Sequence, residues 1–340
     1  MSTDSTTNLS EQKTAMSVLQ QYAVSWKNIT LIQGGSIKTV WKIQSDKGLL
    51  CLKRLKQSYD KALFSVNAQV YIKNSGGNVP GIITNKKGEA ITSLNDQLFV
   101  LYEWIDGHDL NFSNPEDLRN ALVGLARFHC FSKGYQPADE SRVSTKLGKW
   151  PEQYESMLNK LGLWTETARA NAAQQNYSAY IKQTAAIIDI GKTALEEIRK
   201  SAYEELATAG SKSIVLCHQD YGKGNALMTA KGVYILDLDG VTFDLPARDL
   251  RKLIGKAAEN RNQWKTESIH EITGWYEESN PMSGKERKLL YIDLLFPHWY
   301  YGLVKNQFQA NKPVKASEIE RIAKLELSKV SLLKTLLIKE

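Results

Sequence analysis

The hydrophobic pattern of this chain changes its period once, near residues 103–107, and this change limits the folds that the chain can adopt. Before the change, apolar residues occur in short runs bounded by turn residues, which is typical of half-buried strands. The runs that predict strands are residues 28–33, 40–44, 49–55, 81–84, 89–94 and 97–103. Residues 46–48 (Asp-Lys-Gly) predict a hairpin turn, and a helix at about 60–74 is expected to end at Gly76 and Gly77.

After the change, apolar residues recur with the helical period of 3.6 over residues 115–132, 151–207 and 247–340, around a β-rich island at 213–239. We therefore predict an α+β fold of two lobes: a small antiparallel β lobe over residues 1–103 and a large helical lobe over residues 104–340, with a helical insertion at about 140–210. The length of 340 residues agrees with two lobes, since a domain typically has about 150. In the first lobe, Ser10 is expected to cap a first helix, and residues 1–9 are expected to be mobile.

Composition excludes several classes of protein. The chain is 42% hydrophobic and 24% charged, which is ordinary for a globular protein and unlike a disordered or fibrous one. Its three cysteines, Cys51, Cys130 and Cys217, are widely spaced and form no CxxC pair, which argues against a disulfide scaffold or a zinc site and favours a reducing compartment. No apolar run reaches the roughly 18 residues that span a bilayer, and the polar N-terminus lacks a signal-peptide pattern. We expect a soluble protein that is made and kept inside a cell.

The formal charge of +7 invites the hypothesis of a polyanionic partner such as nucleic acid. However, the lysines are scattered and mostly interleaved with acids, as near residues 192–206, and no basic stripe with interleaved aromatic residues occurs. We therefore expect solvated helix faces and no nucleic-acid partner.

The island at 213–239 carries the residues that point to chemistry. An apolar strand leads into His218-Gln219-Asp220 and a glycine-containing loop that ends at Asn225, and a second apolar strand presents Asp237 twelve residues later. Phosphoryl transfer needs this set: a carboxylate that orients the acceptor hydroxyl and takes its proton, and oxygen ligands for Mg²⁺. Chance polar residues at strand ends are the alternative, and a lone DxD motif also occurs in glycosyltransferase metal sites. The spacing H-x-D-x-x-x-x-N, followed by a strand-borne Asp, favours phosphoryl transfer.

These motifs resemble those of the aminoglycoside phosphotransferase/choline kinase superfamily, over nearly the whole chain. The resemblance rests on residues 218–225, on Ile235-Leu236-Asp237-Leu238-Asp239, on Arg248-Asp249-Leu250 and on residues 122–129 (LVGLARFH). Residues 101–107 (LYEWIDG) and 114–118 (NPEDL) most resemble the CotS-type spore-coat branch of Bacillus. The resemblance implies a protein-kinase-like fold, and it implies synthesis in the cytoplasm of the sporulating mother cell and a place in the spore coat.

The resemblance also assigns roles to single residues. Asp220 corresponds to the catalytic base, Asn225 and Asp237 to the metal ligands, and His218 to a residue that braces the catalytic loop without reacting. Lys53 matches the lysine that pairs with the phosphates of ATP, although the neighbouring Arg54 leaves that assignment ambiguous.

Two backbone segments complete the expected nucleotide site. Gly34-Gly35-Ser36 would cover the phosphates, and Glu103 to Ile105 would receive adenine through backbone groups. One departure matters, because active kinases of this fold pair the lysine with a glutamate on the helix of the small lobe. The helix expected here contains no glutamate; Asn67 or Gln69 could bind Lys53 as a neutral partner, and Asp60 is expected to cap the helix.

The leading hypothesis is a spore-coat-associated phosphotransferase that uses ATP and Mg²⁺ and acts on a hydroxyl of a small molecule, of the amino-alcohol or sugar type. Its alternative is a structural coat component with a kinase-like fold and little or no catalysis, which the missing glutamate favours. Other spore coat proteins are possible partners under both hypotheses. The acceptor pocket is expected beside Asp220, lined by some of five aromatic residues of the last helices: Trp264, Trp275, Trp299, Tyr300 and Tyr301.

Overall fold

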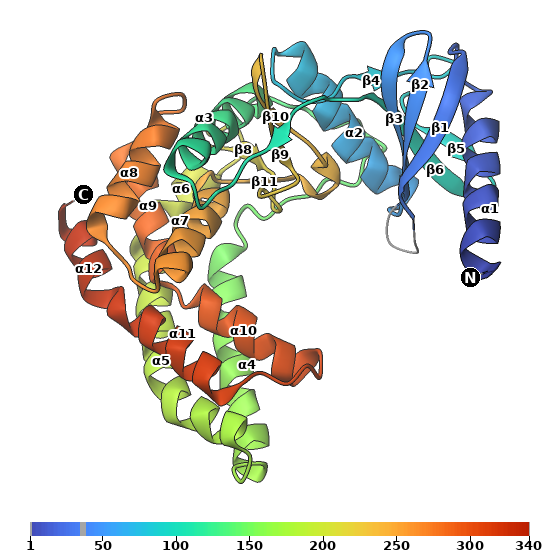
Figure 1. Ribbon diagram of the computed structural model, residues 1–340. Helices are drawn as coiled ribbons and strands as arrows, with labels where there is room; N and C mark the ends of the chain where they lie inside the picture. The colour runs from blue at the N-terminus through green and yellow to red at the C-terminus, as the bar shows by residue number, and fades with distance from the viewer. Residues whose placement is uncertain (1, 35–38, 340) are drawn as a thin grey trace. The chain divides into compact units, whose positions relative to one another are not determined.

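The computed structural model describes residues 2–34 and 39–339 (Figure 1). Their contacts group into two compact units. The first unit contains the chain up to Ser144 together with Asp220–Thr242, and the second contains Thr145–Gln219 together with the chain from Phe243 onward. The lobe boundary expected near residue 103 lies inside the first unit, because β7 (His108–Asp109) pairs there with β9 (Ala226–Thr229). The division into lobes at residue 103 stays a prediction.

The first unit is built around an antiparallel sheet of six strands in the order β1–β2–β3–β6–β4, with β5 beside β6. Its strands are β1 (Trp26–Gln33), β2 (Thr39–Ser45), β3 (Gly48–Leu55), β4 (Ile82–Ile83), β5 (Thr92–Leu94) and β6 (Gln97–Glu103). Gly48 closes the β2–β3 hairpin at the predicted turn with a φ of 92°, a left-handed conformation that glycine adopts without strain. Each run that the sequence predicts as a strand overlaps one of these six.

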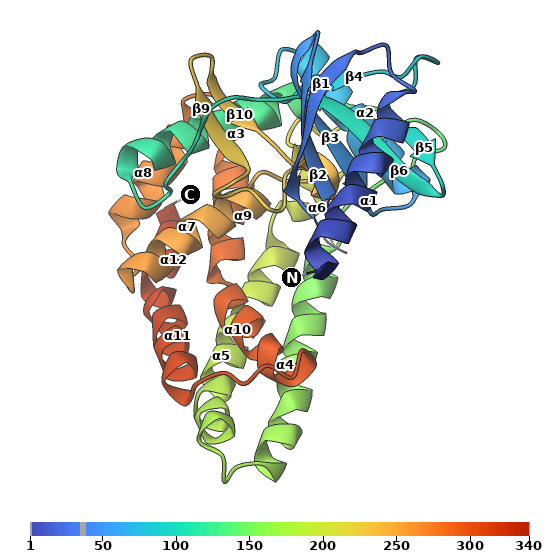
Figure 2. The same ribbon diagram turned by 45° about the vertical axis from the view of Figure 1, so that its right-hand side comes forward.

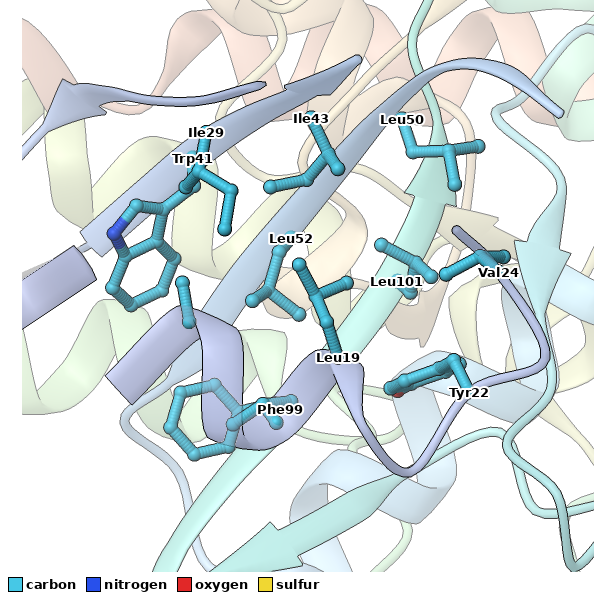
Figure 3. Packing of buried hydrophobic residues seen from close by; sticks show 12 residues of the cluster. Leu19, Tyr22, Val24, Ile29, Trp41, Ile43, Leu50, Leu52, Phe99 and Leu101 are labelled. Atoms are coloured by element: carbon cyan, nitrogen blue, oxygen red, sulfur yellow. The ribbon is translucent and has the colours of Figure 1, made fainter. Parts of the chain in front are cut away.

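Helix α1 (Ser2–Leu19) covers one face of this sheet (Figure 3). Leu19 and, just after the helix, Tyr22 are buried there in a cluster with side chains from four strands, among them Leu52 and Phe99. The helix begins at Ser2, so the prediction that Ser10 caps it is wrong, and residues 2–9 are helical. The physical reason is that residues 1–9 contain no glycine or proline that would end the helix.

Helix α2 (Tyr59–Asn74) covers the other face, where Ala62 and Val66 pack against Leu55 and Val100. Ser58 is its N-cap residue, and Asp60 lies in its first turn instead of at the cap as expected. The first unit also contains α3 (Pro115–Ser132) and the hairpin of β9 and β10 (Gly232–Ile235), which lie side by side (Figures 1 and 2). The side chain of Asn114 caps α3, because it accepts the backbone N–H groups of Glu116 and Asp117.

The second unit is mainly helical. Its helices are α4 (Trp150–Ala170), α5 (Gln175–Lys200), α6 (Tyr203–Ala207), α7 (Ala247–Arg261), α8 (Thr266–Glu277), α9 (Gly284–Leu295), α10 (His298–Gln309), α11 (Ala316–Ser328) and α12 (Val330–Lys339). A short ladder of β8 (Val215–Cys217) and β11 (Thr242–Asp244) precedes α7. In the described part of the chain, no helix combines the length and apolar character needed to cross a bilayer.

Candidate active site

Lys53 lies on β3, whose side chains alternate between the two faces of the sheet. On the face that α1 covers, Leu52 belongs to the core, and Arg54 forms an ion pair of 3.0 Å with Glu11 of α1. Lys53 and Cys51 point to the opposite face, where Lys53 is 6% exposed. The alternation therefore separates the two candidates that the sequence left ambiguous, because Arg54 is engaged with α1 and Lys53 faces a cavity.

The ammonium of Lys53 lies between two carboxylates of one short segment. Its Nζ is 2.7 Å from Oδ1 of Asp237 and 2.6 Å from Oδ2 of Asp239. Burial favours the neutral amine, but the carboxylates of Asp239 and Asp237 outweigh burial and raise the pKa of Lys53 above its ordinary value. Lys53 is therefore a fixed positive charge at neutral pH.

The backbone after β10 brings the oxygen ligands together. Asp237 has a left-handed conformation, with a φ of 62° and a ψ of 59°, and a 3₁₀ turn at Leu238–Gly240 follows it. Asp tolerates this region better than most residues, because its short polar side chain forms local hydrogen bonds. The backbone N–H of Leu236 donates to the carbonyl of Asn225 at 3.0 Å, so Asn225 lies beside the residue that precedes Asp237.

A cavity of about 310 Å³ adjoins these groups within the first unit. Its lining includes five of the residues that the sequence predicts for nucleotide and metal binding: Lys53, Glu103, Ile105, Asn225 and Asp237. Apolar and aromatic side chains complete the wall: Val40, Cys51, Tyr102, Trp104, Leu227, Leu236 and Leu238. A mostly apolar cavity with a few convergent polar groups is typical of a small-molecule site.

Of the remaining predicted site residues, two do not belong to the lining of this cavity and two are not among the residues that the structure describes. Gly34 and Asp220 are described, but they do not belong to the described lining of this cavity, which reaches Gln33 next to Gly34. Gly35 and Ser36 lie outside the described residues. Their expected role over the phosphates stays a prediction.

The end of β6 provides backbone groups at one side of the cavity. The N–H of Glu103 donates to the carbonyl of Gly81 at 2.8 Å, and that of Trp104 donates to the carbonyl of Leu49 at 3.1 Å. The backbone of Ile105 makes no hydrogen bond with another residue within 2–34 and 39–339. Its N–H and C=O can therefore serve a ligand in the cavity, as recognition of a purine base requires.

The side chain of Glu103 lines the cavity and also makes contacts with other parts of the protein. Its Oε2 accepts the N–H of Gly81 at 2.8 Å and lies 3.1 Å from the ammonium of Lys73 on α2. Partial burial raises the pKa of this carboxyl, but these two contacts outweigh it and bring the pKa below its ordinary value. Glu103 thus links α2 to the end of β6.

The hypothesis that an amide of α2 binds Lys53 is wrong in this structure. The side chain of Gln69 is 4% exposed, and its Nε2 donates to the carbonyl of Pro80 at 2.7 Å. Among the described residues, no hydrogen bond joins Asn67 to Lys53. Carboxylates take this place because a charge-assisted contact with an ammonium is stronger than a neutral one.

The loop that leads to Asp220 is fixed from the start of α7. Asp249, which is 1% exposed, accepts the backbone N–H of His218 at 2.6 Å and that of Gln219 at 3.1 Å. Lys252 donates to the carbonyl of Gln219, and Nε of Arg248 donates to its side-chain oxygen at 3.0 Å. His218 is fully buried, which agrees with a bracing role.

Gln219 has a φ of 72°, which is uncommon for a residue with a long side chain. A conformation of this kind persists only where its surroundings enforce it, and contacts from α7 do so here. Asp220, the next residue, is exposed, and its carbonyl accepts Nδ2 of Asn225 at 2.9 Å. The conformation of Gln219 therefore determines the direction in which the chain continues to Asp220, the predicted base.

Three of the five late aromatic residues expected near the acceptor are buried in the helical unit. Trp264, Tyr300 and Tyr301 are at most 8% exposed, and the hydroxyl of Tyr300 is hydrogen-bonded to Thr184 inside the helical unit. Trp299 differs, since it is half-buried and lines a cavity of about 360 Å³ with His298 and others. A Cβ atom on Gly255 would lie 1.9 Å from the Trp299 ring, so the absence of a side chain there admits this ring.

The sequence motifs, the fold and the cavity agree with a comparison against known families. The family model described as "Spore coat putative kinase YutH" matches residues 17–334. The chain belongs to this spore coat family. The predicted resemblance to spore-coat members of the aminoglycoside phosphotransferase superfamily is thereby confirmed.

Two further comparisons place this family member among known proteins. Spore coat protein S of Bacillus subtilis (strain 168) is 24% identical over 328 residues, which cover 95% of this chain and 93% of that protein. A solved aminoglycoside phosphotransferase from Alicyclobacillus acidocaldarius aligns with a TM-score of 0.74 at 16% identity, over 96% of each chain. An amicoumacin kinase in complex with AMP-PNP, Ca²⁺ and Ami aligns with a TM-score of 0.60 at 14% identity, also over 96% of each chain. The predicted kinase-like α+β fold is confirmed by these likenesses.

Sequence reasoning missed two features of the site in this spore coat family member. The sequence shows Asp239 as the second acid of a DxD motif, but it does not predict the contact of Asp239 with Lys53. The DxD spacing was the available indication, since a turn after Asp237 can present both carboxylates to one cation. The strain at Gln219 had no indication in the sequence, because nothing in the residue type predicts a left-handed conformation.

Proposed function

We propose that this chain is a spore-coat-associated phosphotransferase that uses ATP and Mg²⁺ to phosphorylate a hydroxyl of a small molecule, of the amino-alcohol or sugar type. One observation carries the proposal: Lys53, Asn225 and Asp237, which are far apart in the sequence, line a single cavity. A protein with a purely structural role would have no need for a buried lysine and oxygen ligands at such a place. The phosphotransferase fold of the family supports the same reaction class.

The nucleotide is proposed to lie in this cavity, with its base beside Ile105 and its phosphates toward Lys53. Apolar side chains such as Leu227 and Leu238 supply flat contacts for the base, and the backbone of Ile105 supplies hydrogen-bonding groups. Lys53 carries a positive charge that suits the phosphate oxygens. Phosphoryl transfer depends mainly on such positioning and charge stabilisation.

The residues present fit a magnesium ion. Asp237 and Asn225 line the same cavity and offer a carboxylate and an amide oxygen, and Asp239 offers a second carboxylate near Lys53. Hard oxygen donors of this kind, completed by phosphate oxygens and water, are what Mg²⁺ prefers. The bound ion would neutralise charge on the transferring phosphoryl group.

Asp220 is proposed to orient the acceptor hydroxyl and to accept its proton. The proton would pass to a carboxylate oxygen of Asp220 as the hydroxyl oxygen bonds to the terminal phosphorus of ATP. The bond from that phosphorus to the bridging oxygen would break, and ADP would leave with the bonding electron pair. The acceptor is proposed to bind with its hydroxyl beside the carboxylate of Asp220.

The place of action is proposed to be the spore coat, after synthesis in the cytoplasm of the mother cell. The names of two relatives from Bacillus subtilis, Spore coat protein S and Endospore coat-associated protein YutH, support the coat. Other coat proteins are proposed as partners, together with the small acceptor.

A structural coat component with little or no catalysis is the second candidate function. A specific observation favours it: no carboxylate of α2 reaches Lys53 among the described residues. The one acidic residue of α2 is Asp60 in its first turn, and Gln69 bonds the Pro80 carbonyl. In that case the kinase-like fold would serve the assembly of the spore coat, and the cavity would not bind a nucleotide.

Calorimetric titration with ATP separates the two candidates. We expect the wild-type protein to bind ATP with Mg²⁺, and EDTA or the Asp237→Asn substitution to weaken binding at least about tenfold. Asp46→Asn is a matched control, because Asp46 lies in the exposed turn of the β2–β3 hairpin. Absence of metal-dependent ATP binding by the wild-type protein would favour the structural role.

A further inference from the structure

A second cavity of the first unit lies behind the hairpin of β9 and β10. It has a volume of about 440 Å³ and is bounded by α3, by the hairpin and by Gly76 and Asn78 of the loop that follows α2. We call it the rear cavity. Its floor is apolar and buried, formed by Phe128, Val233 and Ile235.

The rear cavity is separate from the proposed nucleotide cavity because the hairpin is a wall shared by both. Neighbouring residues of each strand face opposite sides: Met228 lines the rear cavity and Leu227 lines the nucleotide cavity. In the same way Ile235 faces the rear and Leu236 the nucleotide side. Helix α3 packs closely against this hairpin, since a Cβ atom on Gly124 would lie 2.8 Å from Cβ of Val233.

The charges of the rear cavity have one sign. Its described lining contains Arg127 and Lys231 and no carboxylate. Arg127 is exposed and makes no hydrogen bond or ion pair with another residue in the described ranges 2–34 and 39–339. The amides of Asn78 and Asn120 add hydrogen-bonding groups, and Phe131 adds an aromatic wall.

We propose that the rear cavity binds a small organic anion: a phosphate, sulfonate or carboxylate group attached to an apolar or aromatic body. The guanidinium of Arg127 presents a planar set of donors that matches such oxyanions, and Lys231 adds a second positive charge. The apolar floor takes the body of the ligand, and the volume lies in the range of small-molecule sites. The ligand does not touch the nucleotide cavity, so the proposal does not depend on catalysis.

Fluorescence titration tests this proposal with 8-anilinonaphthalene-1-sulfonate and its uncharged analogue N-phenyl-1-naphthylamine. Arg127→Gln should weaken binding of the sulfonate about tenfold and leave the uncharged analogue nearly unchanged. Arg119→Gln is the matched control, because Arg119 is an exposed arginine of the same helix outside the cavity lining. Val123→Trp, which fills the rear cavity, should weaken binding of both probes.

Two further results decide where the probe binds. Lys53→Ala should leave sulfonate binding within about twofold, because Lys53 lines only the nucleotide cavity. Equal effects of Arg127→Gln and Arg119→Gln would overturn the proposal, and so would loss of binding in Lys53→Ala with retention in Val123→Trp. Thermal unfolding of each variant shows whether the variant is folded. The result of the probe titrations does not depend on whether the protein binds ATP.

Discussion

The ammonium of Lys53 lies 2.7 Å from Oδ1 of Asp237, although 184 positions separate the two residues in the sequence. The same carboxylate is the one proposed to bind a cation. A cation bound by Asp237 would offset part of the negative charge around Lys53 and leave the ammonium available to a phosphate. The pair thus ties the proposed metal site to the proposed phosphate site within one compact unit.

Substitution of Lys53 and of Arg54 should have different effects. We expect Lys53→Ala to weaken ATP binding at least about tenfold, because the charge beside the cavity is lost. Arg54→Ala should leave ATP affinity within about twofold but cost about 1–3 kcal/mol of stability, since Arg54 also donates to the buried hydroxyl of Thr39. Calorimetry and urea unfolding measure both quantities. A larger effect of Arg54→Ala on ATP affinity would contradict the assignment of Lys53.

Substitution of Asp220 should separate catalysis from binding. Asp220 lies outside the described lining of the nucleotide cavity, so Asp220→Asn should keep ATP affinity within about twofold. Turnover should fall about 10²–10⁴-fold, because the residue proposed to take the hydroxyl proton is lost. Release of ADP in the presence of a panel of amino alcohols and sugars measures turnover. Undiminished turnover of the variant would refute the proposed role.

Labelling of Cys51 provides a test that does not depend on turnover. Cys51 is partly exposed and lines the nucleotide cavity, so bound ATP with Mg²⁺ should slow its alkylation by iodoacetamide about tenfold or more. Burial raises the pKa of Cys130 and that of Cys217, so these thiols should react slowly and independently of ATP. Mass spectrometry of the peptides gives the rate at each site. Equal rates at Cys51 with and without ATP would contradict nucleotide binding in this cavity.

Asp249 should be important for both stability and catalysis. Asp249→Ala would leave the N–H groups of His218 and Gln219 without their acceptor, at a cost of about 3 kcal/mol. Turnover should fall with it, because Gln219 directly precedes Asp220. Asp249→Asn keeps one acceptor oxygen and should cost less. Urea unfolding of the two variants checks this order, and a reversed order would contradict the proposed hydrogen bonds.

His298 should contribute to acid sensitivity. Burial, together with the guanidinium of Arg251, lowers the pKa of His298 to about 3, although Asp293 opposes this change. The unfolded state therefore binds a proton that the folded state does not between pH 6.5 and about 3, and stability is lost as the pH falls through this range. The slope is up to about 1.4 kcal/mol per pH unit. His298→Gln should flatten the pH dependence of the urea midpoint in this window, and an unchanged slope would contradict it.

The sequence predicted the elements around the site well, because each depends on local pattern. The alternation of residues 49–55 predicts a strand, and it also places Lys53 and Arg54 on opposite faces, as the structure shows. The spacing of Asp220, Asn225 and Asp237, which predicts a catalytic base and metal ligands, is also visible in the sequence alone. The start of the first helix was misplaced, because a serine such as Ser10 is favourable at a cap but is also tolerated inside a helix.

What the sequence by itself determined is the set of chemical groups, their order along the chain and the family to which it belongs. The tertiary structure alone decided which groups meet. Asp239 and not an amide of α2 reaches Lys53, Gln69 turns to Pro80, and Tyr300 is buried whereas Trp299 lines a cavity. The physical reason is that local pattern fixes the backbone of each element, whereas burial and ion pairing depend on residues that are distant in the sequence and compete for the same partner.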